Sequence, residues 1–276
     1  MSRLEEILER ATKLRDGGVT PLPPTSNKTE SFPDESSYRV EKPLKIENHF
    51  LVPIADPHSP VAEEYRKLKS KIVKLSKEDG FKNVIMVTST VPGEGKSLTS
   101  LNLALSLAQE YDHTVLLVDA DLRRPSIARY LGISQEKGLT DCLMKGVQIP
   151  EVLIKTGIGK LAVLPSGSAV ADPVELLSSA RMQEFISELK NRYPDRYVII
   201  DTPPVLSFAE TYAIASAVDG VLFVIQERAA PLKNIQDALA TLKHVNLFGI
   251  VYNNVEFSRF DENYRYYDHR HYYRVK

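Results

Sequence analysis

The feature that most constrains the fold is a glycine-rich turn, TVPGEGKS at residues 90–97, set between an apolar run and a helical pattern. The apolar run is Val84–Thr88, and the helical pattern covers residues 96–110. Gly93 and Gly95 allow the backbone to wrap closely, so that several N–H groups point inward at an anion. The N-terminus of the following helix adds partial positive charge. The turn therefore predicts a phosphate-binding loop.

The side chains of this loop predict which ligand it takes. Lys96 can reach the β- and γ-phosphates of a nucleotide, and Ser97 can offer a hydroxyl to Mg²⁺. The general pattern has glycine where this chain has Thr90, which is a departure from it. We predict that the loop binds ATP or GTP with Mg²⁺ as cofactors, through Pro92, Gly93, Glu94, Gly95, Lys96, Ser97 and Leu98.

Apolar runs alternate with helical patterns along most of the chain. Continuous Val/Ile/Leu strands separated by helices indicate a mostly parallel sheet that is covered on both faces. The predicted fold class is therefore α/β, a P-loop NTPase whose chemistry lies at the carboxyl ends of the strands. The expected strands are 84–88, 115–118, 161–164, 197–200, 220–225 and 248–252, and the first expected helix of the sheet domain is 59–75.

Aspartates follow two of these strands. Asp119 and Asp121 come at the end of the run 115–118, and Asp201 ends the run 197–200. Singly, each would more often be a helix cap or a turn residue. Three of them beside a P-loop predict a cluster that holds Mg²⁺ and activates a nucleophile.

Three motifs in this order resemble those of one family. GEGKS, the apolar run into DADLRRP, and VIIDTPP resemble the Walker A, Walker A′ and Walker B motifs of bacterial tyrosine kinases. That family serves capsule and exopolysaccharide synthesis and has a deviant-Walker ATPase-like fold. The resemblance covers roughly residues 55–276, and the start MSRLEEILERATKLR looks like the stand-alone kinases associated with exosortase.

The resemblance implies a role for each acidic and basic residue. Lys96 would bind the γ-phosphate, and Asp119 would accept or orient the proton of the attacking phenol. The metal would be held, directly or through water, by Ser97, Asp121 and Asp201. A tyrosine hydroxyl has a pKa near 10, so a nearby carboxylate helps to take its proton.

Three further residues have open roles. Asn253 follows the last strand, where related folds place an asparagine that contacts adenine, and a purely structural role is equally expected. Arg123 or Arg124 either stabilises charge in the transition state, or is solvated or holds the loop.

The chain ends in a tyrosine cluster. Charges and histidines interrupt these aromatics without the alternation of a strand. Stacking on nucleic acid is conceivable because arginines interleave with the rings, but Asp261, Glu262 and Asp268 dilute the positive charge. The resemblance implies that the kinase autophosphorylates this cluster in trans, at Tyr264, Tyr266, Tyr267, Tyr272 and Tyr273. Full modification would add about −8 to −10 charges and weaken subunit assembly.

Glu63, Arg66 and Lys69 lie at i, i+3 and i+6 of the helix 59–75. Such a set is ordinarily a solvated charged face. The family has an E-x-x-R-x-x-R helix at its subunit interface, so the resemblance implies a ring-like homo-oligomer that phosphorylation disrupts. Lys69 replaces the last arginine and loses its bidentate fork.

Composition bounds the remaining expectations. A net charge of −1 gives no reason to expect nucleic acid, and one cysteine, Cys142, excludes an internal disulfide framework. No apolar run approaches the roughly 20 residues that span a bilayer. We expect a cytoplasmic protein, peripheral to the inner membrane through a partner. The expected parts are an amphipathic helix at 1–18, a linker at 19–45, the kinase domain at 46–255 and the tail at 256–276.

The resemblance also implies two partners and leaves two alternatives. The partners are an inner-membrane chain-length-determinant protein that activates the kinase and a cognate tyrosine phosphatase. One alternative is a switch ATPase of the partitioning or septum-placement type, although those carry a lysine where this chain has Val91. The other is a scaffold that binds ATP without transferring phosphate.

Overall fold

The structure is a computed structural model that describes residues 39–40, 48–78, 80–110, 112–192 and 195–256. The predicted N-terminal helix at 1–18 and the five tail tyrosines lie outside the described residues. The predicted linker also lies outside them, apart from residues 39–40. No helix in the described ranges has both the length and the apolar content to cross a bilayer.

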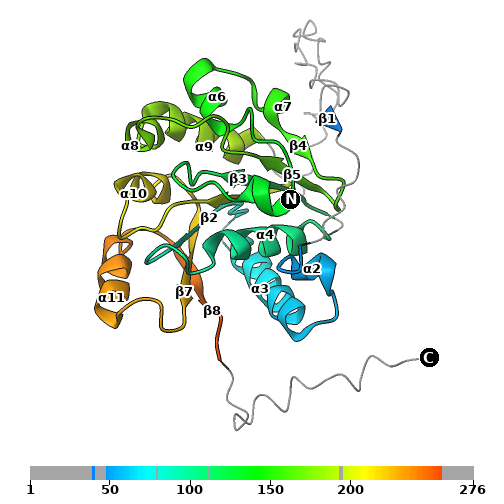
Figure 1. Cartoon of the computed structure of the whole chain (residues 1–276), viewed down its shortest axis with the longest axis vertical. Helices are drawn as coiled ribbons and strands as arrows, with labels where there is room; N and C mark the ends of the chain where they lie inside the picture. The colour runs from blue at the N-terminus through cyan, green and yellow to red at the C-terminus, as the bar shows by residue number, and fades with distance from the viewer. Residues whose placement is uncertain (1–38, 41–47, 79, 111, 193–194, 257–276) are drawn as a thin grey trace, which may run out of the picture. The chain divides into compact units, whose positions relative to one another are not determined.

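An eight-stranded sheet in the order β1-β4-β5-β3-β6-β2-β7-β8 forms the centre of the described fold (Figure 1). Neighbouring strands run parallel except for the pair β4–β5. The six strands expected from the sequence are confirmed to within two residues at each end. The strands are β1 (Arg39–Val40), β2 (Val84–Ser89), β3 (Thr114–Asp119), β4 (Ile154–Lys155), β5 (Leu161–Leu164), β6 (Arg196–Asp201), β7 (Gly220–Gln226) and β8 (Leu247–Asn253).

Helices cover both faces of this sheet, as the fold class predicted (Figure 1). One face packs against α2 (Val52–Ala55), α3 (Pro60–Ser76), α4 (Lys96–Leu107) and α5 (Ile127–Leu131). The other packs against α6 (Leu139–Lys145), α7 (Ile149–Val152), α8 (Pro173–Leu177), α9 (Ala180–Arg192), α10 (Ala209–Ala215) and α11 (Leu232–Thr241). Successive side chains of a strand serve opposite cores: Leu117 packs on the α4 side and Leu116 on the other.

Local sequence accounts for where the helices begin. Ser59 caps α3 by accepting a hydrogen bond from the Ala62 N–H at 3.1 Å, and Pro60 takes the first turn, where its missing N–H costs nothing. The predicted helix 59–75 is therefore confirmed. Two short strands were not foreseen: β4, which is antiparallel to β5, and β1, which lies within the segment 19–45 predicted as a linker.

The topology brings the three motifs together. β2 pairs with β6, and β6 pairs with β3, all parallel. The carboxyl ends of these adjacent strands therefore meet at one edge of the sheet, which is where open α/β sheets bind their ligands. The P-loop follows β2, and the two acidic motifs end β3 and β6.

Candidate active site

The P-loop is held in shape by its own glutamate. Gly93 and Gly95 have φ angles of +92° and +87°, a left-handed conformation that glycine adopts without strain. Between them Glu94 is fully buried, and its Oε2 accepts a hydrogen bond from the Val91 N–H at 2.8 Å. The sequence predicted Glu94 as an ATP-binding residue, and this contact shows that its carboxylate braces the loop.

Asn253, at the end of β8, packs directly on this loop. Its Nδ2 donates to the carbonyl of Glu94 at 2.9 Å. A Cβ placed on Gly95 would lie 2.1 Å from the same nitrogen, so only glycine fits there. The asparagine therefore supports the loop through this hydrogen bond. Its expected contact with adenine stays a prediction. The other two loop positions differ in burial: Pro92 is exposed and Leu98 is half-buried.

Lys96 opens α4 and reaches across to the β3 motif. Its Nζ donates to Asp121 Oδ2 at 2.6 Å and to Ser97 Oγ at 3.2 Å, and the side chain is largely buried. Burial alone would lower the pKa of Lys96, but the negative charges of Asp201 and Asp121 outweigh it and raise the pKa. The ammonium group therefore stays charged in a site with little water.

Asp119 is fully buried at the end of β3. Its Oδ2 accepts hydrogen bonds from the N–H groups of Ser126 and Ile127, both at 3.1 Å. Its Oδ1 accepts none from the described residues. Burial, followed by the charge of Asp201, raises the pKa of Asp119 to about 8, against the lowering effect of the two backbone hydrogen bonds. Such a pKa suits a group that takes a proton near neutral pH.

Asp201 lies beside it at the end of β6. Its Oδ1 accepts a hydrogen bond from Ser100 Oγ at 3.1 Å, and its buried Oδ2 accepts none from the described residues. Burial raises the pKa of Asp201, although the charge of Lys96 opposes the effect. Sequence reasoning missed Ser100, whose signal was its position one helical turn after Lys96 on the same face of α4.

These residues fit a magnesium nucleotide. Within the described ranges, no group of three or more His, Cys, Asp or Glu side chains forms a metal cage. Mg²⁺ does not require one, because it usually binds through one or two carboxylates, waters and the phosphates of its substrate. The available donors are the hydroxyl of Ser97 and the carboxylates of Asp121 and Asp201, whose unpaired Oδ2 is an acceptor without a partner.

The two arginines of the β3 motif have different surroundings. The backbone N–H of Arg124 donates to Asp121 Oδ1 at 3.0 Å. The side chain of Arg123 turns toward α10, where its Nε donates to Glu210 Oε1 at 2.7 Å. Its guanidinium carbon also lies 4.5 Å from the centre of the Phe208 ring. Sequence reasoning did not identify Glu210, because it looks like any other acidic residue in the first turn of a helix.

The charged face of α3 has partners within the chain. Arg66 Nε donates to Glu63 at 2.7 Å, and Arg66 Nη1 donates to the carbonyl of Pro57 at 2.7 Å. Lys69 forms an ion pair with Glu110 at 2.6 Å. The glutamate and arginine side chains remain about two-fifths exposed, so another subunit can still reach them. Their oligomer role stays a prediction.

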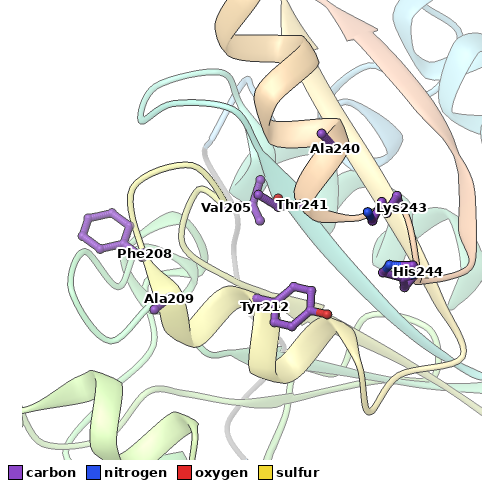
Figure 2. A pocket seen from close by; sticks show the side chains of 8 residues that line it. All are labelled: Val205, Phe208, Ala209, Tyr212, Ala240, Thr241, Lys243 and His244. Carbon is purple, nitrogen blue, oxygen red and sulfur yellow. The ribbon is translucent and has the colours of Figure 1, made fainter.

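A separate groove lies between α10 and α11, with a volume of about 430 Å³ (Figure 2). Its lining is mainly apolar, with two basic side chains at the α11 end: Val205, Phe208, Ala209, Tyr212, Ala240, Thr241, Lys243 and His244. None of the predicted ATP- or metal-binding residues lines it. The groove is therefore distinct from the P-loop site.

Comparisons with known proteins decide between the readings of this site. The family model of an AAA domain matches residues 82–254. The tyrosine-protein kinase YwqD of Bacillus subtilis is 37% identical over 223 residues, which are 79% of this chain and 90% of that protein. The chain belongs to the bacterial tyrosine kinases. Its activity is accordingly that of a protein-tyrosine kinase.

Solved structures agree with this membership. The chimerical protein CapA2B2 has a TM-score of 0.70 and 27% identity, over 81% of this kinase and 98% of that chain. The kinase domain of Escherichia coli tyrosine kinase ETK has a TM-score of 0.68 and 27% identity, over 75% and 82%. The septum site-determining protein MinD of Pyrococcus horikoshii shares the fold at a TM-score of 0.53 and 22% identity, over 64% and 72%.

Proposed function

We propose that this kinase uses ATP and Mg²⁺ to phosphorylate the tyrosines of its own C-terminal segment, in trans between copies. The observation that carries the proposal is the convergence of Lys96, Asp119 and Asp201 at one sheet edge, with two buried carboxylate oxygens lacking partners in the described structure. The acceptors are proposed to be Tyr264, Tyr266, Tyr267, Tyr272 and Tyr273.

Each residue of the site has a proposed task. When bound, ATP supplies the phosphoryl group and Mg²⁺ supplies positive charge beside it. Lys96 holds the terminal phosphates, while Ser97, Asp121 and Asp201 hold the metal directly or through water. Asp119 takes the proton of the acceptor phenol, for which its raised pKa is suited. The proposed role of Asn253 is to contact adenine while it supports the loop.

The proposed setting is capsule or exopolysaccharide synthesis or export, with the kinase in the cytoplasm at the inner membrane. This part rests on the resemblance of the motifs to the family that serves these pathways. A membrane chain-length-determinant protein would activate the kinase, and a tyrosine phosphatase would reverse it. The homo-oligomer is proposed to form through Glu63, Arg66 and Lys69 and to weaken as the tail gains charge.

The test is phosphotyrosine mapping by mass spectrometry after the purified full chain is incubated with ATP and Mg²⁺. We expect phosphate on the tail tyrosines of the wild type and none in Asp119→Asn or Lys96→Met. A parallel sample contains a cytoplasmic fragment of a membrane activator. Mixing a Lys96→Met chain with a wild-type chain whose five tail tyrosines are phenylalanine tests transfer in trans, because only the inactive copy then carries the acceptors.

The other outcomes point to other functions. Phosphate release with no phosphotyrosine, with and without the activator fragment, would contradict the proposal and favour a switch ATPase. Nucleotide binding with neither phosphate release nor phosphotyrosine would favour a scaffold. Phosphotyrosine that appears only outside residues 264–273 would retain the kinase and overturn the proposed acceptors.

A further inference from the structure

Arg123 joins the two loops that carry the acidic residues of the site. It follows Asp121 by two positions in the loop after β3. Its partner Glu210 lies in the first turn of α10, which follows the loop that starts at Asp201. Arg123 Nε donates to Glu210 Oε1 at 2.7 Å. One ion pair therefore connects the loop after β3 to the helix that follows the β6 loop.

Burial makes this contact different from a surface ion pair. The Glu210 side chain is fully buried, whereas that of Arg123 is one-third exposed. A buried carboxylate is stable only where a cation and hydrogen bonds replace water. The other oxygen, Oε2, accepts no hydrogen bond from the described residues. Glu210 thus depends on Arg123 for its charge partner.

Phe208 completes the arrangement. The guanidinium of Arg123 lies 4.5 Å from the centre of its ring, within the range of a cation–π contact. Phe208 also lines the groove between α10 and α11, at the end away from Lys243 and His244 (Figure 2). The ring covers one side of the arginine and limits the directions that the guanidinium can take.

The β3 loop is also held by its own carboxylates. Asp119 binds the N–H groups of Ser126 and Ile127, and Asp121 binds that of Arg124. These contacts set the shape of the loop but do not tie it to the β6 loop. Among the described residues, the sheet contributes the hydrogen bond from the Ala120 N–H to the Asp201 carbonyl at 2.8 Å, and Arg123 adds a side-chain hydrogen bond from the β3 loop to Glu210.

The structure assigns Arg123 and Glu210 as positioning residues that act as one unit, holding the Asp119–Asp121 loop at a fixed separation from the Asp201 loop for phosphoryl transfer. The side chain of Arg123 is committed to α10, so it serves by holding the loop and not by contacting the transferred phosphate. Small displacements of positioned groups are costly, since about 1 Å can lower a rate about 100-fold. The assignment rests on the kinase activity and not on which tyrosines accept phosphate.

The test is a double-mutant cycle on the full chain with Glu210→Gln, Arg123→Gln and both together. Initial rates of total phosphotyrosine formation and of ATP turnover are measured across ATP concentrations. We expect each single variant to lower kcat at least about tenfold and to leave the KM for ATP within about twofold, because the P-loop is untouched. The double variant should be no worse than the poorer single variant.

Two control variants keep the cycle decisive. Glu188→Gln removes the exposed Arg192–Glu188 ion pair of α9 and should leave the rates unchanged. Arg123→Lys keeps a charge beside the buried carboxylate but loses the planar, stacked guanidinium, so a folded protein with an intermediate kcat is expected. If the Glu210→Gln protein does not fold, the rates of Arg123→Lys decide the test.

Two results would overturn the assignment. One is a Glu210→Gln or Arg123→Lys protein that is folded and within about twofold of wild type in both rates. The other is a double variant whose loss is the product of the single losses, since independent residues multiply. Phosphotyrosine outside the tail would contradict the proposed acceptors. The double-mutant cycle could still be interpreted, because its rates measure total phosphotyrosine wherever it forms.

Discussion

Asp119 and Asp201 are register partners on the adjacent parallel strands β3 and β6, and both side chains are fully buried. Burial is the main cause that raises the pKa of each carboxyl. The charge of Asp201 adds to it at Asp119, and the charge of Asp121 adds to it at Asp201. Lys96 is the cation that partly offsets them. The site is therefore an acidic pair that is suited to a second cation.

Replacing the lysine tests its central role. Lys96→Met removes the ammonium that donates to Asp121 at 2.6 Å, so phosphotyrosine formation should fall about 100-fold or more, as for other charge-stabilising donors. Lys233→Met, at an exposed position of α11, is the matched control and should retain wild-type activity. Anti-phosphotyrosine blotting with quantified standards measures both. A Lys96→Met rate within tenfold of wild type would contradict the role.

The pKa of Asp119 predicts how stability depends on pH without nucleotide or magnesium. The folded protein keeps the proton up to about pH 8, whereas an ordinary aspartate loses it near 3.8. Raising the pH between these values therefore removes stability, by at most about 1.4 kcal/mol per pH unit.

Asp119→Asn lacks this dependence, because asparagine does not titrate. In urea unfolding between pH 5.5 and 9, the variant should gain stability over the wild type as the pH rises, and the gain should level off above about pH 8. Parallel curves across this range would show that the pKa of Asp119 is ordinary.

Sequence predicted the parts of the site that are local. The GEGKS loop with Lys96 is read from consecutive residues, and Asp119 and Asp201 each end an apolar run. Parallel neighbours place such strand ends at one edge, so the acidic cluster followed from the fold class. Strands of four to seven residues carried a clear apolar signal, whereas β1 and β4 have two residues each and carried none.

The contacts that sequence reasoning missed join residues that are far apart in the chain. Glu210 pairs with Arg123 from 87 residues away, and Asn253 reaches the Glu94 carbonyl from 159 residues away. Nothing near Glu210 distinguishes it from an ordinary acidic residue in the first turn of a helix, which the helix dipole alone favours. Its contact with Arg123 arises only because the start of α10 lies beside the β3 loop in the folded chain.

Substitutions at two glycines distinguish the effect of backbone strain from that of a steric clash. Gly95 has φ +87° and a Cβ there would lie 2.1 Å from Asn253 Nδ2, whereas Gly80 has φ +97° with nothing within 4 Å. Gly80→Ala should cost about 1–2 kcal/mol of stability from backbone strain and leave ATP binding unchanged. Gly95→Ala should bear that strain and also displace Asn253, so ATP affinity should fall at least about tenfold.

Fluorescent-nucleotide titration and thermal unfolding measure the two effects. Adding Asn253→Ala to Gly95→Ala removes the steric conflict and should recover only part of the affinity, because the left-handed strain remains and the contact of Asn253 with the loop is lost. Equal ATP affinities for the two single alanine variants would mean that the contact with Asn253 does not limit the loop.

Cys142, on α6, provides a probe of native packing because it is the only cysteine of the chain. Burial, followed by the charges of Asp141 and Glu188, raises the pKa of its thiol to about 12 from 9.0. At pH 8 the folded protein therefore holds about 1,000-fold less thiolate than an exposed cysteine, and thiolate is the reactive form.

Ellman's reagent should react at least about 100-fold more slowly with the native chain than with the urea-unfolded chain. A fast native reaction that persists when ATP and Mg²⁺ are added would show that α6 is open in the folded protein, contrary to the packing of Cys142 against the core.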